Sequence, residues 1–199
     1  MPVIKGTQSI NPIYKGTDKI GKIFKGLDLV YQSFVYNPVA ALIERTIEKV
    51  DVELTNEITN IGENAFAECN LLKSVTIPSS VTSIGDSAFY NCSSLSNVTI
   101  PSSVTSIGGS AFAGCTSLPT ITIPSSVTSI GSYAFLVCTS LTTIKILAST
   151  PPSLYSVADI SESTTTIYVP SSSLELYKTT DKWKDLTTRE TNPVTFVGI

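Results

Sequence analysis

Apolar residues return to equivalent positions every 23 residues through most of this chain, as from Phe89 to Phe112. Glycine, phenylalanine and cysteine show the interval most clearly. The glycines are Gly62, Gly85, Gly108 and Gly131, the phenylalanines are Phe66, Phe89, Phe112 and Phe135, and the cysteines are Cys69, Cys92, Cys115 and Cys138. A fixed period of roughly 20 to 50 residues is typical of a solenoid. In such a fold each coil buries its apolar side chains only by stacking on its neighbours, so the repeat predicts one continuous core.

The first part of each repeat has the pattern of a short strand. Val98, Thr99 and Ile100 alternate apolar and polar side chains, which indicates one buried and one exposed face. Pro101 then ends the strand, because it has no backbone N–H to donate to a neighbouring strand. The same alternation recurs in the other repeats, so we expect these strands to stack as a parallel sheet.

The second part of each repeat turns back towards the core. Val104 and Ile107 form another short apolar step, and the glycine after Ile107 allows the chain to turn. Ala111, Phe112 and Cys115 have the spacing of one inward-facing turn of α-helix or 3₁₀-helix. Phenylalanine is therefore expected to stack on phenylalanine, and cysteine on cysteine, along the whole solenoid.

The complete motif resembles a known family of repeats. From Leu95 to Cys115 it reads Leu-x-x-Val-x-Ile-Pro-x-x-Val-x-x-Ile-Gly-x-x-Ala-Phe-x-x-Cys, which is similar to the BspA-like leucine-rich repeat of bacterial surface proteins and protist expansions. Residues 71–146 follow the motif almost without departure and 51–70 follow it well. The resemblance implies a β-rich α+β fold, a leucine-rich-repeat solenoid of short parallel strands joined by 3₁₀ or helical turns, over residues 51–170.

The last repeat and the residues after it depart from the motif. Residues 147–170 keep the strand pattern but lack the Ala-Phe-Cys half. Residues 171–199 resemble the C-terminal cap that such arrays often carry. In this interpretation Tyr177 and Trp183 lie on a helix and cover the last open coil.

The N-terminal 36 residues have a different repeat, with a period of 10 between Lys15-Gly16 and Lys25-Gly26. Each Lys-Gly pair predicts a tight turn, so residues 1–36 are expected to form a β-meander. Three short strands bury too little surface to be stable alone. We therefore expect this segment to anchor the chain or to oligomerise it, through Tyr14, Lys15, Gly16, Phe24, Lys25, Gly26 and Tyr31.

Residues 37–50 connect the meander to the solenoid. Asn37 followed by Pro38 is a favourable helix start, and the apolar residues after it keep helical spacing. A short helix or linker is one prediction, and a strand from about Thr46 is the alternative.

Residues 19–31 resemble N-terminal segments of virion proteins from tailed phages of gut bacteria. The first residues also lack the apolar stretch of a signal peptide. The resemblance implies a non-enzymatic virion surface protein, such as a head-fibre, decoration or tail-associated subunit. Its partners would be other virion proteins and further copies of itself, as a dimer or trimer formed through residues 1–50. The alternative is a bacterial cell-surface or secreted adhesin.

Composition argues against several other functions. The chain has no histidine, which removes the commonest general base and metal ligand, and we expect no catalytic residue, metal or cofactor. A net charge of −3 does not suggest nucleic-acid binding, and no apolar run is long enough to span a membrane. Acidic residues between Glu44 and Glu68 are spread as on a solvated face.

The four cysteines permit two interpretations. Their even number is compatible with disulfides. However, their spacing follows the repeat and each lies three residues after an inward phenylalanine, which favours buried free thiols.

The outward strand positions form a polar ladder with few charges. Its members are Thr76, Thr99, Thr122 and Lys145, flanked by Asn97, Thr120 and Thr143. Threonine favours exposed strands, so the ladder is explained by solvation and strand propensity alone. The alternative is a docking face for a host surface protein or a glycan. A second polar row runs through Thr82, Thr105 and Thr128.

Overall fold

The structure is a computed structural model that describes residues 50–54, 56, 58–156 and 159–199. The meander predicted for residues 1–36 and the helix, linker or early strand predicted before Val50 lie outside the described residues. The anchoring residues proposed between Tyr14 and Tyr31 lie outside them as well.

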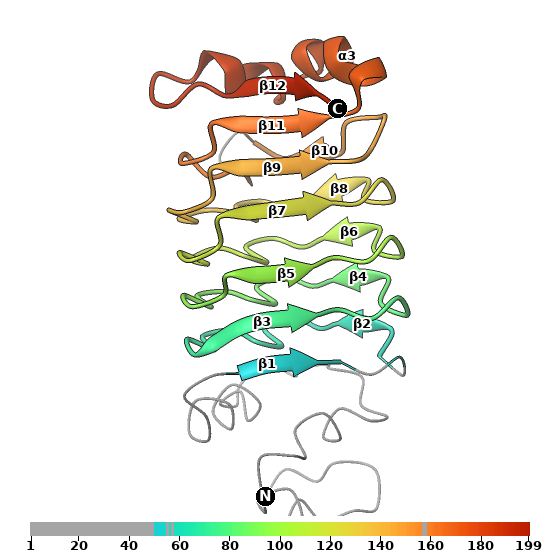
Figure 1. The fold of residues 1–199 in the computed structure, drawn as a ribbon, viewed down its shortest axis with the longest axis vertical. Helices are drawn as coiled ribbons and strands as arrows, with labels where there is room; N and C mark the ends of the chain where they lie inside the picture. The colour runs from blue at the N-terminus through green and yellow to red at the C-terminus, as the bar shows by residue number, and fades with distance from the viewer. Residues whose placement is uncertain (1–49, 55, 57, 157–158) are drawn as a thin grey trace, which may run out of the picture.

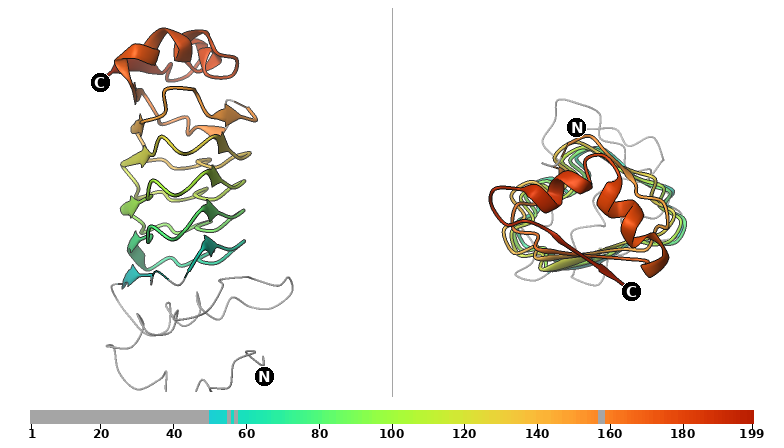
Figure 2. Two further views of the ribbon diagram at one scale, coloured as in Figure 1. Left: turned by 90° about the vertical axis from the view of Figure 1, so that its right-hand side faces the viewer. Right: turned by 90° about the horizontal axis from the view of Figure 1, so that it is seen from above.

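The described residues form a straight column of stacked coils (Figures 1 and 2). One side of the column, called the front here, carries a parallel strand from each coil. These front strands are β1 (Val50–Glu53), β3 (Leu72–Thr76), β5 (Asn97–Thr99), β7 (Thr120–Ile123), β9 (Thr143–Ile146), β11 (Thr166–Val169) and β12 (Thr195–Gly198). Neighbouring front strands pair residues that occupy the same position in adjacent repeats, as Val75 with Val98 and Ile121 with Ile144. The predicted solenoid of parallel strands is confirmed.

The front strands form two sheets and not one. The first sheet has the order β1-β3-β5, and the second has the order β12-β11-β9-β7. In neighbouring coils a backbone N–H just before the strand donates to the previous coil, as from Ser96 to Lys73 and from Thr142 to Pro119. Pro119 occupies this position between β5 and β7 and has no N–H to donate. The division between the sheets falls at this coil, although the coils remain stacked (Figure 1).

The second apolar step of each repeat also forms strands. They are β2 (Asn60–Ile61), β4 (Ser83–Ile84), β6 (Ser106–Ile107), β8 (Ser129–Ile130) and β10 (Ser153–Leu154), which pair in a five-stranded parallel sheet. Glycine follows most of these strands because the coils approach closely there. A Cβ atom on Gly108 would lie 2.5 Å from the backbone carbon of Gly85, a distance that no side chain tolerates.

The third side of the column is built from turns. We expected one turn of α-helix or 3₁₀-helix here, and hydrogen bonds three residues apart do occur, as from Cys115 N–H to Phe112 oxygen (3.1 Å). The Phe112 N–H, however, donates to Ala134 in the next coil (2.9 Å), so no continuous helix forms. Two backbone positions per coil have positive φ on this side, at Asn64, Glu68, Ser87, Asn91, Ser110, Gly114, Tyr133 and Val137.

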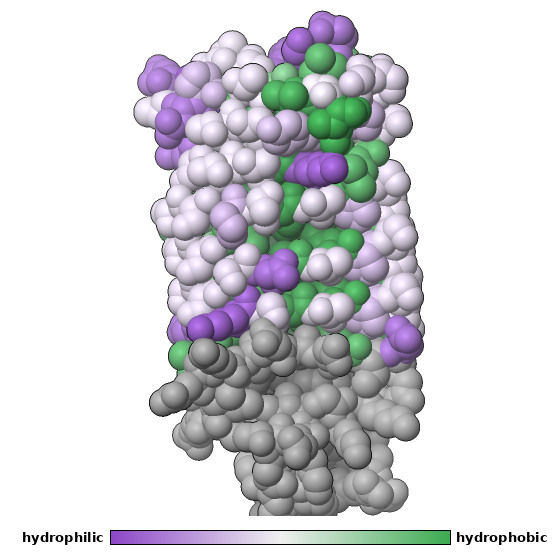
Figure 3. All heavy atoms as spheres, in the orientation of Figure 1, coloured by the Kyte–Doolittle hydropathy of each residue, from purple (hydrophilic) through white to green (hydrophobic). Residues whose placement is uncertain are grey.

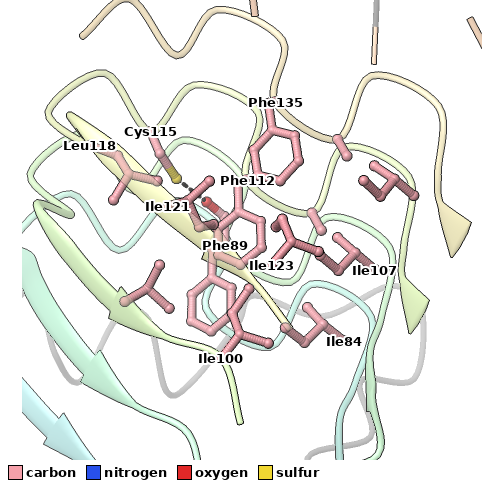
Figure 4. Packing of buried hydrophobic residues seen from close by; sticks show 14 of the residues in the cluster. Ile84, Phe89, Ile100, Ile107, Phe112, Cys115, Leu118, Ile121, Ile123 and Phe135 are labelled. Atoms are coloured by element: carbon pink, nitrogen blue, oxygen red, sulfur yellow. Dashed lines mark hydrogen bonds between the residues drawn. The ribbon is translucent and has the colours of Figure 1, made fainter. Parts of the chain in front are cut away.

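The core contains the expected stack of phenylalanine rings. Adjacent centroids are 5.1 Å apart for Phe66 and Phe89, 5.2 Å for Phe89 and Phe112, and 5.7 Å for Phe112 and Phe135. The interplanar angles do not exceed 8°, so the rings are nearly parallel. Isoleucines of the front and second strands surround this stack (Figure 4), which produces the continuous interior that the repeat predicted.

Asp159 completes the third side where the last repeat lacks its Ala-Phe-Cys half. In an earlier coil the Ser110 N–H donates to the Ser132 carbonyl of the next coil (2.8 Å). The equivalent N–H of Tyr133 donates instead to Oδ1 of Asp159 (2.9 Å). Phe135 N–H donates to the backbone oxygen of Asp159 (3.1 Å). One buried residue thus supplies, through side chain and main chain, two acceptors that the missing half would have supplied.

The C-terminal residues close the column. Their elements are η3 (Ser171–Ser173), α3 (Leu174–Thr179), η4 (Lys184–Thr188) and β12, which adds a front strand that the sequence did not predict. Tyr177 lies in α3 and its hydroxyl donates to Ala148 oxygen (2.9 Å). Trp183 does not lie on a helix as expected but in the turn immediately before η4, and its Nε1 donates to Pro152 oxygen (2.7 Å). The two buried rings meet edge to face over the last coil.

Candidate binding surface

The seven ladder positions proposed from sequence all lie on the front of the column. We call them the front ladder: Thr76, Asn97, Thr99, Thr120, Thr122, Thr143 and Lys145. Strand register aligns Thr76 with Thr99, and Thr122 with Lys145. Six of these side chains are exposed and Thr143 is half-buried. Figure 3 shows this face, where pale, weakly polar side chains lie beside green, hydrophobic ones along the middle of the column and purple, strongly hydrophilic residues are scattered.

Hydroxyl groups of the second polar row are engaged in the fold. Thr105 Oγ1 donates to Thr82 oxygen (3.2 Å), and Thr128 Oγ1 donates to Thr105 oxygen (3.3 Å). Serines nearby do the same, with Ser103 Oγ 2.6 Å from Val81 oxygen. These side chains therefore tie one coil to the previous one, and the second row has a structural role.

Front-ladder hydroxyls make no such bonds. Within the described residues, Thr99 and Thr122 donate no side-chain hydrogen bond to any protein group. Their donors and acceptors are therefore available to a ligand, and their methyl groups add apolar contact area. The two polar rows look alike in the sequence, and the structure distinguishes them. The sequence does not show the difference because the carbonyl that accepts each hydrogen bond belongs to the adjacent coil.

The ladder continues beyond the positions proposed from sequence. Tyr168 pairs with Lys145 in register and is half-buried, and Thr166 pairs with Thr143. Counting one further repeat from Lys145 finds Tyr168 in the sequence, so a signal for it was present. The front surface therefore ends in one cation and one aromatic ring near the C-terminal cap.

The cysteines occupy the core and not the surface. Cys69, Cys92, Cys115 and Cys138 are free thiols and fully buried. Burial is the main cause that raises the pKa of Cys92 and Cys115 well above the ordinary value of 9.0, and it raises the pKa of Cys138 to about 12. These groups remain protonated, so they suit neither nucleophilic chemistry nor metal binding. Among the described residues, no cluster of cysteine and carboxylate side chains has the composition of a metal site.

The part of the chain that the structure describes contains no helix with the length and apolar character needed to cross a bilayer.

Coil shape, strand arrangement and the core together define a leucine-rich-repeat solenoid. Residues 44–174 match a family model described as the BspA type leucine rich repeat region, in six copies. The match covers more than half of the chain, and the protein belongs to this family. No curated protein is matched.

Solved structures of leucine-rich-repeat proteins are similar to this chain. A leucine-rich repeat protein from Eubacterium ventriosum shares 29 % identity at a TM-score of 0.56, covering 73 % of this chain and 37 % of that one. A leucine-rich repeat protein from Bacteroides ovatus shares 24 % identity at a TM-score of 0.42, and the match covers 60 % of this chain and 39 % of that one. A leucine rich cell surface protein from Faecalibacterium prausnitzii shares 23 % identity at a TM-score of 0.38, and the match covers 73 % of this chain and 62 % of that one. The chain spans less than two thirds of the length of each.

Proposed function

We propose that this protein is a non-enzymatic adhesion module that is displayed at a surface and makes contact through the front ladder. The observation that carries the proposal is the difference between the two polar rows. Hydroxyls of the second row are tied to backbone oxygens, whereas those of Thr99 and Thr122 are free for a partner. Repeat solenoids commonly use one extended side in this way, because the stacked coils hold it rigid.

A bacterial surface is the location that the family favours. BspA-type repeats resemble those of bacterial surface proteins, and the Faecalibacterium relative is described as a cell surface protein. The partner would be a host surface protein or a glycan. Because the ladder carries one cation among many hydroxyls, recognition would rest on hydrogen bonds and methyl contacts more than on charge.

Binding of the labelled full chain to epithelial cells and to bacterial cells tests the proposal. Replacing Thr99 and Thr122 by glutamate places two charges in the middle of the ladder, and we expect cell binding to fall at least tenfold. Unchanged binding would show that the front ladder is not the contact surface.

A matched control adds the same charges elsewhere. Ser102 and Ser125 are exposed, lie in the turns after β5 and β7, and are separated by one repeat, as Thr99 and Thr122 are. Ser102→Glu with Ser125→Glu therefore reproduces the charge repulsion between coils. This control is expected to bind like the unchanged protein.

A second candidate function is a virion surface subunit. It is favoured by the resemblance of residues 19–31 to phage virion proteins and by the Lys-Gly repeats of residues 1–36, which we propose as the anchoring and oligomerising segment. In that case residues 1–50 contact other virion proteins, and the front ladder contacts the host.

Two measurements separate the candidates. Mass spectrometry of purified phage particles detects the chain only if it is a virion component. Light scattering of the full chain and of a variant lacking residues 1–36 measures oligomerisation. A full chain that is a dimer or trimer and becomes monomeric on deletion supports the anchoring role. A strict monomer in both cases argues against it.

A further inference from the structure

The third side of the column carries large exposed apolar side chains near its C-terminal end. Tyr133 is 50 % exposed, Val137 56 % and Leu136 39 %, all in one coil. Tyr155 of the next coil is 77 % exposed. Most of the other large side chains of the solenoid are buried, so this group departs from the repeat.

The departure has a conformational cost at two of these positions. Tyr133 has a φ of 60° and Val137 a φ of 57°. Bulky and β-branched residues are strongly disfavoured in this left-handed region, which glycine, asparagine and aspartate tolerate best. Earlier coils have Asn64 at the position of Tyr133 and Gly114 at that of Val137. Side chains kept in such a conformation are often found at functional sites.

Asp159 holds the two tyrosines in place. Its Oδ1 accepts the Tyr133 N–H (2.9 Å), and its Oδ2 accepts the N–H groups of Tyr155 (2.6 Å) and Ser156 (2.7 Å). The carboxylate is fully buried, and both its oxygens accept hydrogen bonds from backbone N–H groups. The backbones of Tyr133 and Tyr155 therefore lie on either side of one carboxylate group. In the described part of the chain neither ring stacks on another ring.

The two segments that carry the tyrosines are neutral and rich in hydroxyl groups. Residues 131–140 and 153–156 contain no charged side chain, and serine or threonine stands at several of their positions. The Arg189 guanidinium near Asp159 is bonded to the backbone oxygens of Ile160 and Ser161, so the tyrosine-bearing segments themselves offer a charged partner no charged side chain. A tyrosine ring offers a flat apolar face with a polar edge, which suits a ligand that combines apolar C–H faces with hydroxyl groups.

We propose that Tyr133 and Tyr155 form a binding site for a neutral saccharide. The pyranose ring packs its C–H face on the tyrosine rings, and the phenol hydroxyls bond to the hydroxyls of the sugar. Leu136 and Val137 extend the apolar floor. This site lies on a different side of the column from the front ladder, so it is independent of the function proposed above.

An array of neutral and anionic glycans, probed with the labelled full chain, tests the site. We expect neutral glycans to be bound and anionic glycans not to be. Tyr133→Asn and Tyr155→Ser should each lower the signal at least tenfold. Tyr133→Asn also removes the unfavourable φ, because asparagine is the residue of the equivalent position at Asn64. Its melting temperature should therefore not fall, and loss of binding cannot be attributed to unfolding.

Tyr90→Ser provides the matched control. Tyr90 lies on the same side two coils earlier, is 38 % exposed, and should be replaceable without effect on glycan binding. Three outcomes would overturn the proposal: no neutral glycan is bound, binding is insensitive to both Tyr133→Asn and Tyr155→Ser, or these variants abolish binding of a protein and not of a saccharide. Thr99→Glu with Thr122→Glu leaves this site intact, so the two proposals fail separately.

Discussion

The Cys115 thiol donates a hydrogen bond to the backbone oxygen of Phe89 in the previous coil, with 3.2 Å between Sγ and the oxygen (Figure 4). Cys138 makes the equivalent bond to Phe112 (3.0 Å). Cysteine at this repeat position is therefore both a small apolar core residue and a weak donor to the neighbouring coil. This double role accounts for its regular recurrence beside phenylalanine without any disulfide.

The buried thiols should be inaccessible to reagents in the folded protein. We expect Ellman's reagent to modify none of the four cysteines in native protein and all four after denaturation in guanidinium, because each side chain is fully buried. Fewer than four thiols after denaturation without a reducing agent would indicate disulfides and contradict the structure.

Stability should fall at alkaline pH because burial raises the pKa of the Cys92, Cys115 and Cys138 thiols. The folded pKa of Cys138 is about 12, above the ordinary value of 9.0, so the folded state retains a proton that the unfolded state loses. The stabilisation is complete below about pH 9 and is lost as the pH rises towards 12. Urea unfolding measures this loss of stability from about pH 8, one unit below the ordinary thiol pKa, to about pH 11, two units above it. Cys138→Ala should flatten the decline, and an unchanged slope would refute the explanation.

Truncation of one stacked ring should destabilise the whole column. Phe112 lies between Phe89 and Phe135, and all three rings are fully buried. Phe112→Ala is expected to lower the free energy of unfolding by about 3 to 5 kcal/mol, as for other buried aromatic residues. Chemical denaturation measures it, with Thr122→Ala as the exposed control, for which a change of about 0.5 kcal/mol or less is expected.

Two adjacent glycines should respond differently to alanine. A Cβ on Gly108 would lie 2.5 Å from the backbone of Gly85, whereas one on Gly109 would lie 3.4 Å from its nearest neighbour, the Ser132 oxygen. Gly108→Ala should therefore cost about 1 to 3 kcal/mol, the usual cost of overpacking. Gly109→Ala should have a much smaller effect. Equal losses in thermal melts of the two variants would contradict the close approach of the coils.

Replacement of Val137 should stabilise the fold. Its φ of 57° is unfavourable for a β-branched residue, and the equivalent position two coils earlier is Asn91. We expect Val137→Asn to raise the free energy of unfolding by about 1 kcal/mol, the typical penalty of the left-handed region. Calorimetry of this variant beside Thr139→Asn, an exposed neighbour, separates the effect of φ from that of added asparagine.

Much of the front ladder was predictable, because alternation within Val98, Thr99 and Ile100 already states which side chains point outwards. The phenylalanine stack was predictable for the same reason: a side chain that recurs once per coil must meet its equivalent when the coils stack. Four features were not predicted. They are the sheet formed by the second strands, the break at Pro119, the role of Asp159 and the added front strand β12. Each depends on which backbone group of an adjacent coil is within reach, and local patterns do not contain that information.

The amino-acid sequence by itself determined the length of the coil, the inward side chains and the continuous core, because periodic burial follows directly from a periodic sequence. Only the tertiary structure decided which polar groups remain available. Thr105 and Thr99 look equivalent in the repeat, yet Thr105 bonds to the coil before it and Thr99 does not. The physical reason is that a hydroxyl forms a hydrogen bond within the protein only if the fold places a backbone carbonyl of the adjacent coil within its reach.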